Sequence, residues 1–141
     1  MDIYSLDRFL EAQERDYEIA LGEITNGRKY SHWMWYIFPQ LRGLGKSDMS
    51  YNYGISGLQE AREYLAHPVL CERLTKICEA LLEHKGKNAY DIFGSIDAKK
   101  LKSSMTLFAI ASNEGSVFHQ VLDCFFDGKM DKRTLALAGL L

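Results

Sequence analysis

The chain has few prolines and no long apolar run, and both shortages narrow the class of protein. Its 141 residues include two prolines, and no hydrophobic run approaches the roughly 20 residues that a membrane-spanning helix needs. The first residues, MDIYSLDRFLEAQERD, are acidic and amphipathic, without the basic and then apolar order of a signal peptide. We therefore expect a cytoplasmic protein that forms one domain over residues 1–141 and has no membrane partner.

Cysteine is scarce and its spacing does not suit a disulfide framework or a metal site. Cys71 and Cys78 stand seven residues apart on a predicted helix, about 10 Å along its axis, which is too far to bridge without distortion. Cys124 leaves the count odd, and the chain contains no C-x-x-C or H-x-x-x-H pair. We expect reduced thiols, no metal site and no cofactor.

A basic excess is also missing. The chain has 17 basic and 19 acidic residues, for a formal net charge of −2, whereas nucleic-acid surfaces usually need clustered positive charge. Lys99, Lys100 and Lys102 form the one compact basic cluster in the sequence. We therefore expect no nucleic-acid partner.

Apolar residues recur at helical spacing, and alternating β-branched runs are absent. A first helix is predicted over 6–24, with Arg8 on its polar face and the Asn26-Gly27 turn after it. Pro68 suits the first position of a long helix that Gly86 closes. Predicted N-caps of other helices are Ser31, Ser56, Asp97, Ser116 and Asp131. The pattern predicts an all-α domain of about seven helices in an orthogonal array.

The segment SHWMWYIFPQ, residues 31–40, concentrates large rings in ten positions. It is predicted to form a short central helix that ends at Pro39. Such a segment belongs in the interior, yet the imidazole of His32, both indole N–H groups and the Tyr36 hydroxyl need hydrogen-bond partners there. The segment is therefore either a core with polar groups in it or the wall of a pocket.

His32 is the candidate catalytic residue, because an imidazole beside indoles can be held neutral for acid or base work near pH 7. The alternative is that it only satisfies a nearby backbone or carboxylate group. Trp33, Trp35 and Tyr36 are candidates to stack on the base or sugar of a ligand, or else form part of the core.

Two further segments are candidates for binding an anion. Gly45-Lys46-Ser47 resembles the end of a phosphate loop, but Gln40 stands where the first glycine should be. Gln40, Arg42 and Lys46 are therefore candidates to contact a small anionic ligand without forming a true phosphate loop. The hydroxyls of Ser103 and Ser104 follow Lys102, which suits phosphate binding, although helical serines commonly bond to the carbonyl four residues earlier.

Three blocks of the chain, SHWMWYIFPQLRGLGKS, YGISGLQEAREYLAHPVLCERL and DIFGSIDAKKLKSSMTLFA, resemble the signature blocks of the bacterial domain of unknown function 1810 family. The resemblance covers nearly the whole chain. It implies a small, predominantly helical cytosolic domain and no established reaction. A distant similarity to helical proteins that process ADP-ribose rests on small size and the aromatic-rich helix.

Two functions therefore compete. In the first, the protein is an enzyme or an enzyme-like binder of a nucleotide-derived or sugar-phosphate ligand, such as ADP-ribose, in a pocket lined by residues 31–40. In the second, it is a non-catalytic interaction module whose partner, which includes a second copy of the chain, docks on a helical face. Convergence of His32, Gln40, Lys102 and Ser103 on one cleft would favour the first.

Overall fold

The computed structural model describes residue 2 and residues 5–141, and helices and connecting loops account for this part of the chain. The helices are α1 (Asp7–Thr25), α2 (Met34–Ile37), α3 (Asp48–Asn52), α4 (Leu58–Ala66), α5 (Pro68–Leu82), α6 (Ala89–Phe93), α7 (Ser95–Ala111), α8 (Val117–Phe126) and α9 (Lys132–Leu137). The all-α prediction is confirmed. The described residues form nine helices rather than about seven because several short segments, including α3 in the glycine-rich loop, make separate turns.

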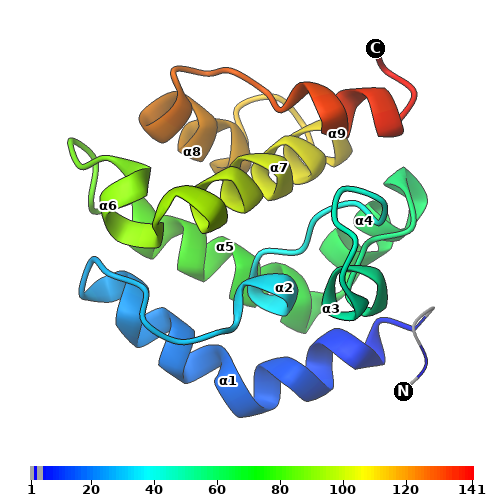
Figure 1. Cartoon of the computed structure of the whole chain (residues 1–141), viewed down its shortest axis with the longest axis horizontal. Helices are drawn as coiled ribbons and strands as arrows, with labels where there is room; N and C mark the ends of the chain where they lie inside the picture. Colours follow the sequence, from blue (N-terminus) through cyan, green and yellow to red (C-terminus); the bar gives the residue numbers. More distant parts are fainter. Residues whose placement is uncertain (1, 3–4) are drawn as a thin grey trace.

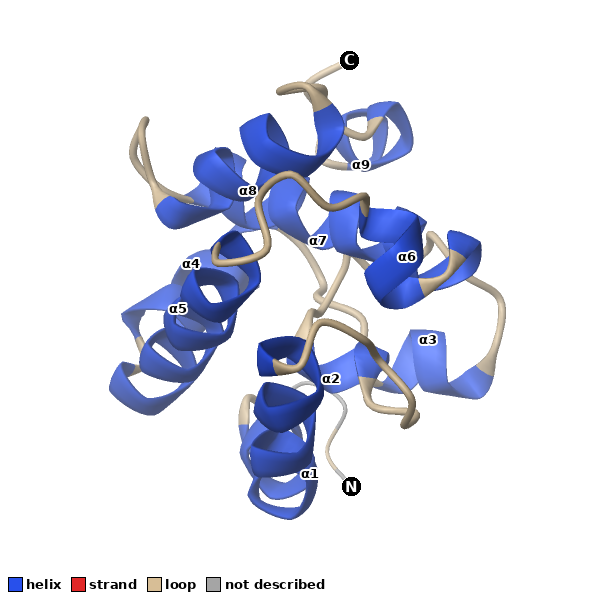
Figure 2. Cartoon of the chain, turned by 90° about the vertical axis from the view of Figure 1, so that its left-hand side faces the viewer, coloured by secondary structure: helices blue, strands red, loops and turns tan. Residues whose placement is uncertain are grey.

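The helices cross one another at varied angles instead of forming a parallel bundle (Figures 1 and 2). Helix α7 packs against α4, α6, α8 and α9, and α5 packs against α1, α4 and α8. The short α2 packs against α1. An isolated parallel bridge between Leu41 and Ile55 closes the loop that carries α3. This loop therefore lies beside α2.

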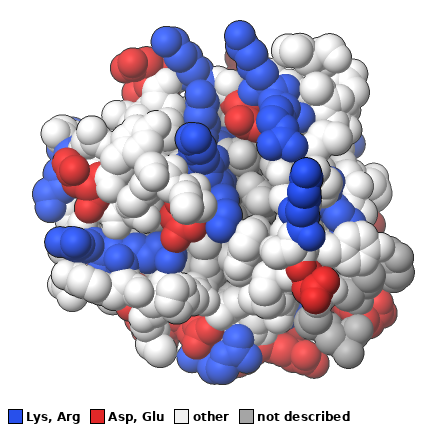
Figure 3. Space-filling view, viewed as in Figure 1, with Lys and Arg blue, Asp and Glu red and all other residues white. Residues whose placement is uncertain are grey.

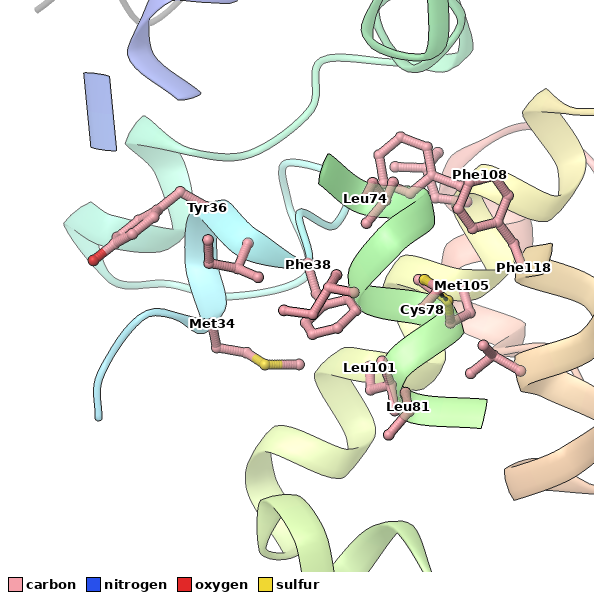
Figure 4. Packing of buried hydrophobic residues seen from close by; sticks show 14 of the residues in the cluster. Met34, Tyr36, Phe38, Leu74, Cys78, Leu81, Leu101, Met105, Phe108 and Phe118 are labelled. Atoms are coloured by element: carbon pink, nitrogen blue, oxygen red, sulfur yellow. Dashed lines mark hydrogen bonds between the residues drawn. The ribbon is translucent and has the colours of Figure 1, made fainter. Parts of the chain in front are cut away.

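Large apolar side chains from several helices fill a common core (Figure 4). The ring of Phe38, just after α2, lies edge-on to Phe93, with 5.9 Å between the centroids. The Tyr36 hydroxyl points away from the core (Figure 4). Cys78 is fully buried with its Sγ 3.7 Å from the Sδ of Met105, and burial raises the pKa of this thiol. The aromatic segment thus contributes both to the core and to its edge.

Four of the predicted local signals are confirmed. Ser116 and Asp131 are the N-caps of α8 and α9, accepting hydrogen bonds from the backbone N–H groups of His119 and Thr134. Pro68 starts α5. Gly27, which follows the C-cap residue Asn26 of α1, adopts φ 84°, a left-handed conformation that glycine reaches without steric cost.

Three predicted N-caps are wrong. Helix α2 begins at Met34, and the Ser31 hydroxyl donates to Glu23 on α1 instead of capping the helix. Helix α4 has Gly57 at its N-cap rather than Ser56. Helix α7 begins before Asp97, whose Oδ2 lies 2.8 Å from the Nζ of Lys29. In two of these places a carboxylate or hydroxyl binds a distant partner in preference to the local backbone.

The prediction that Arg8 lies on the polar face of the first helix is also wrong, because the side chain is buried. It is 1% exposed and forms hydrogen bonds with both carboxylate oxygens of Glu60, at 3.0 and 3.1 Å. Its remaining donors reach the carbonyls of Ser5, Asn52 and Gly54. The guanidinium therefore ties α1 to α4 and to the end of the α3 loop.

Among the described helices, none combines the length and hydropathy required to cross a membrane. The described residues also hold no group of three or more His, Cys, Asp or Glu side chains arranged to bind a metal ion.

Candidate functional site

A cleft of about 580 Å³ lies between the end of α2, the loop after it, α7 and the start of α9. Lys and Arg side chains gather around a hollow on the face seen in Figure 1 (Figure 3). We call the cleft the basic cleft. Its lining residues are Trp35, Gln40, Leu44, Gly45, Tyr90, Ile96, Lys99, Lys100, Lys102, Ser103, Phe126, Asp131 and Arg133.

Positive charge dominates the lining, although the whole chain carries a formal net charge of −2. Lys99, Lys102 and Arg133 form no ion pair with any residue that the structure describes. The lone carboxylate of the lining, Asp131, accepts hydrogen bonds from the backbone N–H and the hydroxyl of Thr134, at 2.9 and 2.6 Å. The cations of the lining therefore outnumber its carboxylate, and this positive excess attracts anions.

Trp35 forms the aromatic part of the cleft together with Tyr90 and Phe126. The Nζ of Lys100 lies 3.8 Å from the centroid of the Trp35 ring and 3.4 Å from the Oδ1 of Asp97. Trp35 is partly exposed, and no described residue accepts a hydrogen bond from its indole N–H. Lys100 thus sits on one face of a ring whose polar group stays available.

Gln40 is 8% exposed and lines the cleft. Its backbone carbonyl accepts a hydrogen bond from the N–H of Ile55 at 2.9 Å, which fixes the residue at the start of the bridge. Its side-chain amide has no hydrogen-bond partner among the described residues. The amide atoms are not among the buried side-chain atoms that lack a partner, so its N–H donors and its oxygen are open to a polar ligand in the cleft.

Lys102 and Ser103 reach the basic cleft from α7. The Ser103 hydroxyl also donates to the carbonyl of Lys99 at 3.1 Å, the helical bond that the sequence leaves open. Ser104 faces the interior instead: it is fully buried, and its Oγ has no partner among the described residues. The two neighbouring serines therefore have different surroundings.

The structure does not bring His32 to the basic cleft. His32 is exposed and precedes α2 in a bend. Its backbone carbonyl oxygen lies 3.4 Å from the Tyr36 hydroxyl oxygen, and no described residue binds its ring. The acid or base role considered for His32 has no support from the geometry of the cleft.

Trp33 and Tyr36 also lie outside the cleft, because their polar groups are satisfied by α1. Trp33 is 1% exposed and donates its indole N–H to Glu23 at 3.0 Å. The Tyr36 hydroxyl donates to Asp16, while Arg15 donates to the hydroxyl. Both residues therefore serve as attachments between α1 and the aromatic segment.

Arg42 and Lys46 do not line the basic cleft either. The Nε of Arg42 donates to the carbonyl of Tyr51 at 2.9 Å, and its guanidinium lies 4.7 Å from the centroid of the Tyr51 ring. Lys46 is exposed next to Gly45, which does line the cleft. Arg42 consequently stabilises the α3 loop.

Glu23 explains how the segment before α2 is held. Its carboxylate accepts four hydrogen bonds, from the N–H groups of Tyr30 and Ser31, the Ser31 hydroxyl and the Trp33 indole. Burial opposes ionisation, but these hydrogen bonds outweigh it and lower the pKa of Glu23 to about 2. The segment therefore turns toward α1, and the cleft begins only at Trp35.

Sequence reasoning missed Arg133 as a site residue, and within the cluster Lys99, Lys100 and Lys102 it named Lys102 alone as a ligand contact. Arg133 reaches the cleft because α9 packs on α7, where the Thr106 hydroxyl accepts a hydrogen bond from the N–H of Asp131 at 2.9 Å. No local pattern marks this pairing of distant helices. The three lysines of the cluster, in contrast, are close together in the sequence and could be recognised there as a concentration of positive charge.

A second hollow, of about 510 Å³, adjoins the basic cleft. We call it the outer hollow. It shares Lys102 and Asp131 with the basic cleft. Its other lining residues are Lys129, Met130, Lys132, Leu135 and Leu141.

Comparisons with known proteins place the chain in a family. The profile of the protein family of unknown function DUF1810 matches residues 3–138. The conserved hypothetical protein Rv1873 from Mycobacterium tuberculosis is similar in structure, with a TM-score of 0.94 and 43% sequence identity, over 99% of this chain and 100% of that one. A comparison with curated proteins gives no significant match. The chain belongs to the DUF1810 family.

Proposed function

We propose that the protein binds a nucleotide-derived or sugar-phosphate anion, of the ADP-ribose type, in the basic cleft. The observation that carries the proposal is the joint presence of Lys102, Arg133, Trp35 and the unpartnered Gln40 amide around one cleft. Its volume of about 580 Å³ lies within the range of small-molecule sites, roughly 300–1,000 Å³.

The cationic side of the cleft suits a phosphate group. Arg133 offers a planar guanidinium that can bind two phosphate oxygens at once, and Lys102 offers a mobile ammonium. Neither is paired with a described carboxylate. An anion therefore gains their attraction without first breaking an ion pair.

The other side of the cleft suits a flat polar ring. Trp35, Tyr90 and Phe126 supply aromatic surface, on which bases stack. A glutamine amide can donate and accept at once, which matches the N6 and N7 edge of adenine. These features favour a nucleobase over a purely aliphatic ligand.

The proposal is for a binding protein and includes no reaction. The described lining of the cleft contains no His or Cys side chain, and its one carboxylate, on Asp131, caps α9. The Ser103 hydroxyl donates to a backbone carbonyl rather than to a base. A positioned general base next to a nucleophile, which nucleophilic catalysis needs, is not among the features that support the proposal.

A thermal-shift panel tests the proposal with AMP, ADP, ADP-ribose, adenosine and inorganic phosphate. A ligand at about 100 times its dissociation constant stabilises the folded state by about 2.7 kcal/mol. We expect stabilisation by nucleotides, loss of it in Lys102→Ala, and its retention in Lys85→Ala, which removes the same charge from an exposed site outside the cleft. No shift with any compound would contradict the proposal.

The alternative, a non-catalytic interaction module, predicts a different result. In that case small anions leave the melting temperature of the protein unchanged. Light scattering then detects a stable dimer or higher assembly of the purified chain. The exposed leucines at the C-terminal end, Leu137, Leu140 and Leu141, are the apolar surface that such a contact would use.

A further inference from the structure

Positively charged side chains continue from the basic cleft into the outer hollow, so a ligand longer than the basic cleft would still meet cations. Lys102 and Asp131 belong to the linings of both the basic cleft and the outer hollow, so the two spaces meet at this pair. Lys129 and Lys132 add two cations on the far side of Lys102. Neither has an ion-pair partner among the described residues.

The charge balance along this path is strongly one-sided. Its cations are Lys99, Lys102, Lys129, Lys132 and Arg133, together with Lys100, which forms an ion pair with Asp97. The one carboxylate on the path, Asp131, uses its Oδ2 to hold the N–H and hydroxyl of Thr134. A single phosphate at Lys102 would leave the cations of the outer hollow without a counter-charge. An anion between like charges that line one path lowers their mutual repulsion.

The outer hollow adds both room and apolar surface to the basic cleft. The basic cleft and the outer hollow measure about 580 and 510 Å³. Met130 and Leu135 give the outer hollow an apolar surface beside its lysines. This mixture suits the carbon skeleton of a sugar next to a charged group, because lysine stems and apolar side chains pack against it while the ammonium groups meet oxygen atoms.

We propose that the ligand is a nucleoside diphosphate or its sugar conjugate, with the base in the basic cleft near Trp35 and Gln40 and the diphosphate across Lys102 into the outer hollow. This inference rests on the proposed function and adds the place of the second phosphate, which lies in the outer hollow rather than in the basic cleft. The second phosphate meets Lys132 and Lys129. Lys102, shared by both spaces, contacts the bridge between the phosphates.

Isothermal titration with AMP and ADP tests the inference on the intact chain. We expect ADP to bind at least about tenfold more tightly than AMP, a difference worth about 1.4 kcal/mol. Lys132→Ala should weaken ADP several-fold and leave AMP within about twofold, because only the second phosphate reaches the outer hollow. Lys102→Ala should weaken both nucleotides, and Lys85→Ala neither.

The outcomes separate this inference from the function on which it rests. If AMP and ADP bind equally well and Lys132→Ala affects neither, the basic cleft binds a nucleotide but the extension into the outer hollow is wrong. If neither nucleotide binds the wild-type chain, the proposed function fails and the inference with it. A short single-stranded oligonucleotide that binds more tightly than ADP would also overturn the inference. Lys132 is exposed, so Lys132→Ala should keep its fold, which circular dichroism checks.

Discussion

Arg8 and Glu60 form a buried, two-point ion pair that fastens helix α1 to helix α4. The Arg8 guanidinium also binds the carbonyls of Asn52 and Gly54, and Glu60 accepts the N–H of Ser56 at 2.9 Å. The pair therefore holds the end of the α3 loop. The same loop contributes Leu44 and Gly45 to the basic cleft, so this attachment far from the cleft supports its wall.

Arg8→Ala should destabilise the fold strongly, because it leaves the buried Glu60 carboxylate without its cation and removes the donor to the carbonyls of Asn52 and Gly54. We expect the free energy of unfolding in urea to fall by about 3–5 kcal/mol. Arg62→Ala is the matched control, since Arg62 is exposed on α4 and should change stability by no more than about 0.5 kcal/mol. Equal effects of the two substitutions would refute the structural role of the pair.

Gly54 is required by close packing rather than by an unusual φ. A Cβ atom at position 54 would lie 2.7 Å from the Cα of Arg42 and 2.8 Å from the carbonyl oxygen of Ser50. Because these are backbone neighbours, Gly54→Ala should lower the free energy of unfolding by about 1–3 kcal/mol. Gly22, in the exposed part of α1, has open space instead.

Gly22→Ala should therefore raise the free energy of unfolding by about 0.5–1 kcal/mol, because alanine has the higher helix propensity. Denaturant unfolding of the two alanine variants measures the contrast. A Gly54→Ala protein as stable as wild type would show that the loop does not pass Arg42 as closely as described.

Glu23 makes part of the stability depend on acid pH. Its pKa is about 2 in the folded protein, against an ordinary value of 4.5, so the folded state binds this proton less readily than the unfolded state. The stabilisation is complete above about pH 4.5 and disappears as the pH falls through about 2. The difference in unfolding free energy between wild type and Glu23→Gln should shrink over that interval. A difference that stays constant from pH 5 to pH 2 would argue against the role of the charged carboxylate.

The two tryptophans should respond differently to truncation. Trp33 is 1% exposed and donates to Glu23, so Trp33→Ala should cost about 3–5 kcal/mol of stability. Trp35 is partly exposed in the cleft, and Trp35→Ala should cost less while abolishing nucleotide binding. Urea unfolding and titration of the same two variants measure both effects. Retention of binding by Trp35→Ala would remove the aromatic side of the proposed site.

Local sequence signals predicted the features that depend on local contacts. Ser116 and Asp131 cap their helices because each meets the N–H of the residue three positions later, and the side chain of that same residue adds a second contact. Ser31 does not cap α2, because Glu23, eight residues earlier, takes its hydroxyl and N–H. Arg8 follows the polar period of α1 but is covered by the chain near residues 52–56. Periodicity contains no information about such covering segments.

Only part of the candidate site was predicted from the sequence, because the place of some of its residues depends on how distant helices pack. Trp35, Gln40, Lys102 and Ser103 meet at the basic cleft, since the end of the aromatic segment and the lysine-rich helix are neighbours in the fold. His32 does not join them, because the chain before α2 turns toward α1 and the residue is exposed. Arg133 could not be found from sequence, since its place depends on the packing of α9 against α7.

A nitrogen–proton correlation spectrum recorded during titration with ADP shows directly whether a nucleotide binds beside Trp35. The chain has two tryptophans, and hence two indole N–H signals, which Trp35→Phe assigns. Trp35 lines the basic cleft, whereas the indole N–H of Trp33 is bound to Glu23. We expect ADP to shift the Trp35 signal in a saturable manner and to leave the Trp33 signal in place. A saturating titration in which the Trp35 signal does not move would contradict this expectation.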